Sequence, residues 1–171
     1  MNNVFRYLCP AMMMVAFLFS CTQSPLPAPE ENSEVSSDLK NSLVGMWQAY
    51  DIIVGIDTIH NSGNSALLEV NNNDWRDKLK LRPIQTIFNA NNTYVSAYCT
   101  DEGRLIRVTS GKWDMKKNQL NIHQLFPNDK EMNYRIELSA GVAQLRSKLD
   151  FDGDGKSDDM YYCQMKKVGD G

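Results

Sequence analysis

Histidine is scarce in this sequence, which contains only two in 171 residues. His60 lies in a loop-like stretch and His123 in a strand-like stretch, and neither has a neighbour that would complete a catalytic pair. The sequence also lacks a nucleophile elbow, a phosphate-binding loop and the ligand spacing of a zinc site. No carboxylate pair stands out for glycoside hydrolysis. We therefore expect that the protein is not an enzyme.

An excess of basic residues is missing as well. The 18 lysines and arginines stand against 21 aspartates and glutamates, which gives a net charge of −3. Nucleic-acid-binding proteins need a basic patch, and attraction to anionic lipids needs clustered lysines and arginines. The composition therefore argues against both kinds of partner.

No apolar run is long enough to cross a membrane. The run from Leu8 to Phe19 falls short of the roughly 20 residues that span a bilayer, and Pro10 would break a helix within it. It follows the basic Arg6 and ends just before Cys21, where the sequence turns abruptly polar. This pattern predicts a secretory signal peptide over residues 1–20.

The boundary at Cys21 resembles the lipobox of bacterial lipoproteins. The apolar Leu18 and the small Ser20 precede the cysteine, although Phe19 stands where a smaller residue is usual. The resemblance implies cleavage before Cys21, a diacylglycerol on its sulfur, and an amino terminus acylated with a chain such as palmitate. Several buried acyl chains make a lasting anchor. We therefore expect a lipoprotein of the cell envelope in the outer membrane, with the periplasmic face and the cell surface both open.

An ordinary signal peptide followed by a chance cysteine is the alternative to this interpretation. The position of Cys21 at the hydrophobic-to-polar boundary, where cleavage must occur, favours the lipoprotein. The resemblance places the anchor at this residue.

Two cysteines remain once Cys9 of the leader and Cys21 are set aside. Cys99 and Cys163 would stand in an exported, oxidising compartment, where disulfides persist. A bridge requires their Cα atoms within about 7 Å of each other. A disulfide and a pair of buried free thiols both fit the sequence.

Composition divides the mature chain into two parts. Residues 21–42 are rich in proline, glutamate and serine and poor in large apolar side chains. Such a segment cannot bury enough surface to offset its ordering entropy, so we expect a flexible tether. Residues 43–171 have the length and patterning of one folded domain.

Short strand-like runs follow one another through this domain, separated by turns rich in glycine, asparagine and aspartate. Short connections require antiparallel neighbours, so the sequence predicts an all-β fold, an antiparallel up-and-down meander of about eight strands. Residues 60–81 are less regular and read as an insert or lid, with a turn of helix from Trp75 to Leu81 capped by Asp74. The predicted strands are Trp47–Thr58, Ile84–Phe88, Thr93–Thr100, Arg104–Trp113, Gln119–Leu125, Met132–Leu138, Val142–Leu149 and Asp159–Val168.

Three short motifs in this domain resemble the lipocalin-like lipoproteins of Gram-negative bacteria. They are Gly45-x-Trp47, the run from Phe88 to Tyr94, and Gly111-Lys112-Trp113 followed by Asn118-Gln119-Leu120. The resemblance spans about Leu43 to Val168 and implies a lipocalin-like barrel that Trp47 plugs at one end. Lys166 and Lys167 stand near the last strand, where a larger lipocalin places an arginine over that tryptophan.

The resemblance also implies a small apolar ligand inside the barrel. The candidate lining residues are Tyr94, Tyr98, Tyr134 and Tyr161. Aromatic strand residues belong to a core more often, and barrels of about eight strands can be filled by their own side chains. The alternative function is a calcium-stabilised interaction module that presents its loops to an envelope protein or a polysaccharide.

An acidic loop carries the most specific site motif. Residues 150–159 read D-x-D-G-D-G-x-x-D-D, in which alternate carboxylates and turn-permitting glycines match the way loops wrap Ca²⁺. Tyr161 replaces the bidentate glutamate of an EF-hand, so the loop resembles those that join strands in integrin-type repeats. A solvated acidic turn is the alternative, but its like charges would repel one another. We expect one structural Ca²⁺, with ligands from Asp150, Asp152, Asp154, the backbone carbonyl of Lys156, and Asp158.

The lipid anchor generates the first prediction. Cys21→Ser removes the sulfur that would accept the diacylglycerol, so the variant is expected to be uncleaved or released from the membrane. Membrane fractionation followed by immunoblotting measures both outcomes. A variant that is still processed and anchored normally would contradict the lipoprotein interpretation.

Overall fold

The computed structural model describes residues 33–59 and 62–170. The predicted signal peptide over residues 1–20, the predicted lipid site Cys21 and the tether as far as residue 32 lie outside the described residues. None of the helices within the described ranges is long and apolar enough to span a membrane.

Strands dominate the described residues. One α-helix precedes nine strands, and a short π-helical turn interrupts them after the second strand. In chain order the elements are α1 (Ser33–Leu43), β1 (Gly45–Ile56), β2 (Ala66–Val70), η2 (Trp75–Leu79), β3 (Gln85–Phe88), β4 (Thr93–Cys99), β5 (Leu105–Lys116), β6 (Gln119–Phe126), β7 (Lys130–Ser139), β8 (Val142–Leu149) and β9 (Asp159–Gly169).

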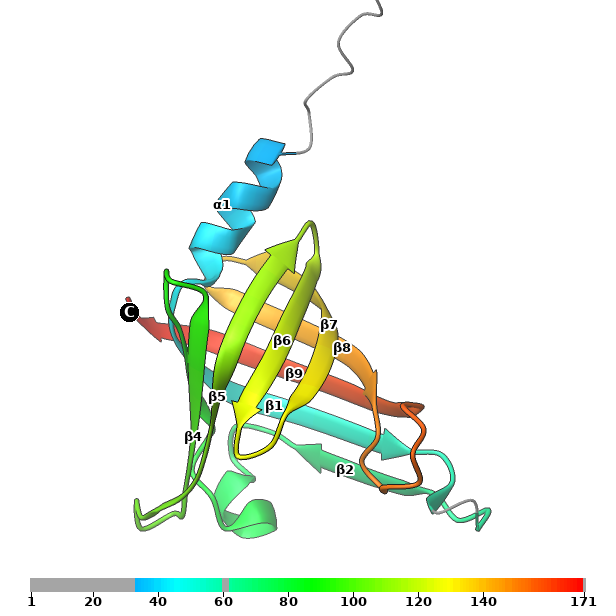
Figure 1. The fold of residues 1–171 in the computed structure, drawn as a ribbon. Helices are drawn as coiled ribbons and strands as arrows, with labels where there is room; N and C mark the ends of the chain where they lie inside the picture. Colours follow the sequence, from blue (N-terminus) through cyan, green and yellow to red (C-terminus); the bar gives the residue numbers. More distant parts are fainter. Residues whose placement is uncertain (1–32, 60–61, 171) are drawn as a thin grey trace, which may run out of the picture.

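Eight of the strands close into an antiparallel barrel. From β3 to β9 each strand pairs with the next along the chain, and β1 pairs with β3 on one side and β9 on the other (Figure 1). The order is the one that short connections impose, because only antiparallel strands can be joined by tight turns. The predicted all-β, up-and-down meander is therefore confirmed.

The ninth strand, β2, was not predicted. It pairs with the second half of β1, from Ile52 to Ile56, whereas β3 pairs with Gly45 to Gln48 of the same edge. Four of the five residues of β2 are exposed and only Val70 is buried. Because β2 is not half-buried, its sequence does not show the alternation of apolar and polar residues that marks a half-buried strand.

The π-helical turn fills the place where β2 and β3 separate along β1. The Trp75 indole, almost fully buried, donates a hydrogen bond to the Tyr50 carbonyl at 3.0 Å, and the Ala49 amide donates to the Ile84 carbonyl at 2.9 Å. Asp74 precedes the turn as predicted, but its carboxylate makes no capping bond. It accepts instead from the side chain of Asn71 at 2.7 Å and pairs with Lys78 at 2.8 Å.

Helix α1 corrects the expectation of a flexible tether throughout residues 21–42, because residues 33–43 are helical. It stands on one end of the barrel and contacts β5 and β7 (Figure 1). Leu43 is fully buried, and its carbonyl accepts a hydrogen bond from the Trp47 indole at 2.7 Å. Lys40 pairs with Asp114 on β5 at 2.9 Å.

Large side chains close the barrel beneath this helix. Trp47 is buried as the resemblance implied, and Phe88 meets Trp113 edge to face at 5.5 Å between ring centroids. A positive charge lies beside a tryptophan at this end, but the tryptophan is Trp113 and the charge belongs to Lys40 of α1. The Lys40 Nζ lies 5.5 Å from the Trp113 ring centroid. Lys167 pairs with Trp47 across β1 and β9, so a lysine occupies the place next to the plug. This end of the barrel is the closed end.

Close strand packing at Gly111 generates the second prediction. A Cβ on Gly111 would lie 2.0 Å from the His123 carbonyl oxygen and 2.9 Å from the Gln124 Cα, beside a register shift between β5 and β6. Gly111→Ala should therefore destabilise the protein by at least about 1–3 kcal/mol. That corresponds to a melting temperature lower by roughly 3 °C or more.

Gly55→Ala is the matched control on β1. Its new Cβ would lie 3.3 Å from the flexible end of the Met160 side chain, and its other contacts, at 3.7 and 3.9 Å, are ordinary van der Waals contacts. We expect a small change in its thermal melt measured by circular dichroism. Equal melting temperatures for the two variants would contradict the close packing of β5 against β6.

Candidate functional site

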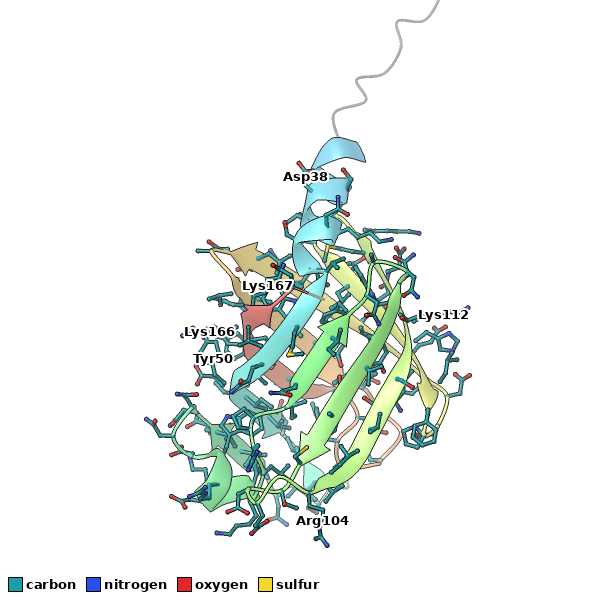
Figure 2. The ribbon with its side chains drawn as sticks, turned by 90° about the vertical axis from the view of Figure 1, so that its left-hand side faces the viewer. Asp38, Tyr50, Arg104, Lys112, Lys166 and Lys167 are labelled. Carbon is teal, nitrogen blue, oxygen red and sulfur yellow. The ribbon has the colours of Figure 1, made fainter. Side chains whose placement is uncertain are left out.

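The barrel encloses a cavity of about 390 Å³ that opens at the end opposite α1. Figure 2 shows the two ends, with Asp38 on α1 at one end and Arg104, just before β5, at the other. Alternate residues of each strand point inward, because side chains along a strand alternate between its two faces. The mouth is lined by Arg107, Lys130 and Asp150.

One wall of the cavity, called the polar wall here, carries its buried threonine, serine and glutamine side chains. It is formed by the neighbouring strands β3, β4, β5 and β6. Thr86 and Ser96 are buried and share a hydrogen bond at 2.8 Å between their hydroxyl oxygens. Thr109 is buried on the next strand, and the amide of Gln124 donates to the Asn128 carbonyl at 3.1 Å. The same strands also contribute the apolar Phe88, Leu120 and Ile122, so this wall combines hydroxyl and amide groups with apolar ones.

The facing wall is largely apolar. It is formed by β7, β8, β9 and β1, which are also consecutive neighbours in the closed sheet. The apolar side chains that this wall contributes to the cavity are Met132, Leu145, Leu149, Met165, Ala49 and Ile52. The buried hydroxyl groups of threonine and serine therefore lie on one side of the cavity, and most of its aliphatic side chains lie on the other.

All four predicted tyrosines line the cavity. Tyr134 and Tyr161 meet edge to face at 5.8 Å between ring centroids, and Phe151 of the acidic loop stacks on Tyr161 at the same separation. Burial raises the pKa of Tyr134 and of Tyr161 above the ordinary value of a phenol. These groups are therefore neutral hydrogen-bonding groups at physiological pH.

Tyr94 differs from the other tyrosines. Its side chain is only 4% exposed, and its hydroxyl has no hydrogen-bond partner among the described residues. Burial raises the pKa of Tyr94. The Thr109 side chain opposes that rise, although it does not meet the geometry of a hydrogen bond to the Tyr94 hydroxyl. Tyr98, nearer the mouth, lies under the Arg107 guanidinium, 5.5 Å from its ring centroid. The cavity thus contains one buried phenol without a partner.

The acidic loop between β8 and β9 lies at the mouth of the cavity. Carboxylate oxygens of Asp150, Asp152 and Asp159 all lie within 4.8 Å of one another, which is close enough to hold a metal ion. Asp159, the first residue of β9, was not among the predicted ligands, although it belongs to the motif. It is almost fully buried and accepts a hydrogen bond from the Phe151 amide at 2.7 Å.

The predicted carboxylate ligands Asp154 and Asp158 are not in this group of three. Asp154 pairs with the ammonium group of Lys156 at 3.3 Å, and Asp158 is exposed. The backbone amides of Gly153 and Gly155 donate to Asp150 at 2.7 and 3.1 Å, and both glycines have positive φ. The glycines curl the loop as the motif predicts, but the curl brings Asp159 rather than Asp158 to the centre.

The two remaining cysteines are free thiols, so the disulfide that the sequence left open is not formed. Cys99 ends β4 and Cys163 lies in β9, with β3 and β1 between the two strands. Cys163 lines the cavity, and burial raises its pKa to about 12. The thiol is therefore protonated at neutral pH and belongs to the apolar wall.

Neither histidine belongs to this site. His60 lies outside the described residues, and His123 of β6 is half-exposed and contacts the exposed Asp129 at 3.0 Å. His123 is not among the residues that line the cavity.

Models of known protein families give no match to this chain, and a search of characterised proteins finds no relative of it.

Proposed function

We propose that this protein is a membrane-anchored lipoprotein of the cell envelope whose lipocalin-like barrel binds a small, mainly apolar ligand in its interior without catalysis. The cavity of about 390 Å³ carries this proposal. Its volume falls in the range of roughly 300–1,000 Å³ typical of small-molecule sites. The signal-like residues 1–20 and Cys21 support the anchor.

The geometry of the barrel fits such an anchor. The chain enters the domain through α1 at the closed end (Figure 1). The mouth of the cavity, lined by Asp150 and Phe151 of the loop between β8 and β9, lies at the opposite end. An anchor that precedes α1 would attach the domain to the membrane by the end opposite the mouth. We infer that the ligand enters from the aqueous side.

The chemistry of the interior supports binding rather than catalysis. The titratable groups deep in the cavity are phenols and the Cys163 thiol, and burial raises the pKa of that thiol to about 12. A group that stays protonated at neutral pH is a poor base or nucleophile. Such groups position a ligand by hydrogen bonding and packing.

We also propose that the acidic loop binds one structural Ca²⁺ through Asp150, Asp152 and Asp159. Carboxylate oxygens are the hard ligands that Ca²⁺ prefers, and the three residues converge within 4.8 Å. Asp159 begins β9 and Asp150 follows β8 directly. A bound ion would therefore tie the last two strands together at the mouth of the cavity.

Exposed apolar side chains around the mouth favour the second candidate function, an interaction module. Leu105 and Ile106 begin β5, Leu125 and Phe126 end β6, and all four are about half-exposed. A calcium-stabilised barrel could present these residues and its loops to an envelope protein or a polysaccharide. The enclosed cavity favours ligand binding as the principal function.

Blocking the mouth generates the third prediction. Leu149→Trp adds a large ring at a cavity-lining position near the acidic loop, and overpacking costs roughly 1–3 kcal/mol. The variant should retain about a tenth or less of the ligand that co-purifies with the wild type, because 1.4 kcal/mol is a tenfold change. Native mass spectrometry of protein purified from its own membranes measures the occupancy.

Lys148→Trp is the control for this experiment. Lys148 is the neighbouring residue on the outer face of β8 and is exposed, so the same ring is added outside the cavity. The control should keep the wild-type occupancy. Equal occupancy in both variants would place the ligand outside the barrel and favour the interaction module.

Calcium binding generates the fourth prediction. Millimolar Ca²⁺ should raise the melting temperature of the wild type, because a ligand that binds only the folded state adds about 2.7 kcal/mol at 100 times its Kd. Asp152→Asn should abolish the rise by removing a ligand charge from the group of three. Asp158→Asn, an equal charge change outside the group, should leave the rise intact. Identical melting curves in calcium and in chelator would show that the loop is an acidic turn that binds no calcium.

A further inference from the structure

We propose that the ligand of the cavity is an uncharged amphipathic molecule with an oxygen atom on one edge, held by the Tyr94 hydroxyl on the polar wall, and with its apolar face against β7, β8, β9 and β1. This inference rests on the proposed function, because it specifies the kind of molecule that the interior binds. Three features of the cavity lead to it: the unpartnered phenol, the two unlike walls and the position of the charges.

The Tyr94 hydroxyl, which has no hydrogen-bond partner among the described residues, predicts a polar atom in the ligand. Tyr94 lines the cavity and is 4% exposed, and its hydroxyl has no hydrogen-bond partner among the described residues. A buried polar group without a partner costs about 1–3 kcal/mol. A ligand oxygen placed beside it would remove that cost. Tyr134 on β7 has no such need, because its hydroxyl contacts the Met132 sulfur at 3.3 Å.

The two unlike walls require a ligand with two unlike faces. Thr86, Ser96 and Thr109 put hydroxyl groups on the side that holds Tyr94. Leu145 and Met165 represent the aliphatic side that faces them. A pure hydrocarbon would leave the Tyr94 hydroxyl unpaired, whereas a molecule that is polar all round would lose hydration against the aliphatic side. An amphipathic molecule satisfies both walls.

The position of the charges indicates that the buried polar atom is uncharged. Arg107, Lys130 and Asp150 are the charged residues that line the cavity, and all three stand at the mouth. The deeper lining consists of hydroxyl, amide, thiol and apolar groups. An ion held beside Tyr94 would lack an opposite charge to offset its desolvation. A carbonyl, ether or alcohol oxygen has no such requirement.

The test uses two naphthalenes of nearly the same shape. In 2-acetylnaphthalene a carbonyl oxygen takes the place of the terminal CH₂ group of 2-isopropenylnaphthalene. Their dissociation constants are measured by titration calorimetry on the whole mature chain from residue 21, with Cys21→Ser in every sample so that no detergent is needed. Wild type should bind the ketone roughly two- to twelvefold more tightly than the alkene, because a net hydrogen bond contributes about 0.5–1.5 kcal/mol.

Tyr94→Phe removes only the hydroxyl and should abolish the preference for the ketone. Tyr134→Phe, the matched control, removes a hydroxyl from the opposite wall and should keep it. Because the Tyr94 hydroxyl makes no hydrogen bond to the described residues, Tyr94→Phe should melt no lower than the wild type. A preference that persists in Tyr94→Phe overturns this inference and leaves interior binding intact. If neither probe binds the wild type, interior binding is overturned and this inference with it.

The infrared carbonyl band of bound 2-acetylnaphthalene provides a second measurement that does not depend on affinity. A hydrogen bond from Tyr94 should shift the band to lower frequency in the wild type and in Tyr134→Phe, and the shift should be lost in Tyr94→Phe. If the ketone bound to the wild type shows the same band frequency as in a hydrocarbon solvent, the inference is overturned. This outcome holds even if Tyr94→Phe cannot be purified in a folded form.

Discussion

The pairing of β1 with β9 is the constraint on which the rest of the structure depends. It joins the first strand of the domain to the last along nearly their whole length, with register shifts after Met46 and after Ala49. The pairing closes the sheet, so that the barrel strands have neighbours on both sides and their backbone groups are satisfied. Without it the polar and apolar walls would belong to an open sheet and would not face each other across a cavity.

Closure alone does not produce a cavity, because a barrel of about eight strands can be filled by side chains. Here the filling is uneven along the axis. Trp47, Phe88 and Trp113 occupy the closed end, where α1 covers them through Leu43. Farther from α1, β4 and β5 contribute the small side chains of Ser96 and Thr109 to the interior, and these leave space that the aromatic rings do not fill. The volume that remains lies between the closed end and the mouth.

The barrel could be predicted from sequence because its strands alternate regularly and its turns are short, whereas elements that depend on distant partners could not. Helix α1 has a polar sequence, and its described anchors, the ion pair of Lys40 with Asp114 and the burial of Leu43, appear only in the folded chain. β2 is an added strand with one buried residue and no alternation. The four tyrosines were identified, but the unpartnered hydroxyl of Tyr94 depends on side chains from several strands.

The ligands of the acidic loop could also be predicted from sequence only in part, and the difference is one residue. Spacing along the motif nominated Asp158, but β9 begins at Asp159, where side chains alternate strictly between the two faces of the sheet. Asp159 is buried, and its carboxylate accepts a hydrogen bond from the Phe151 amide of the loop. The same carboxylate lies close to those of Asp150 and Asp152. Proteins depart from local packing rules mainly at functional sites. In this barrel a buried acid and an unpartnered phenol both line or border one cavity, which supports the proposal that the cavity is the functional site.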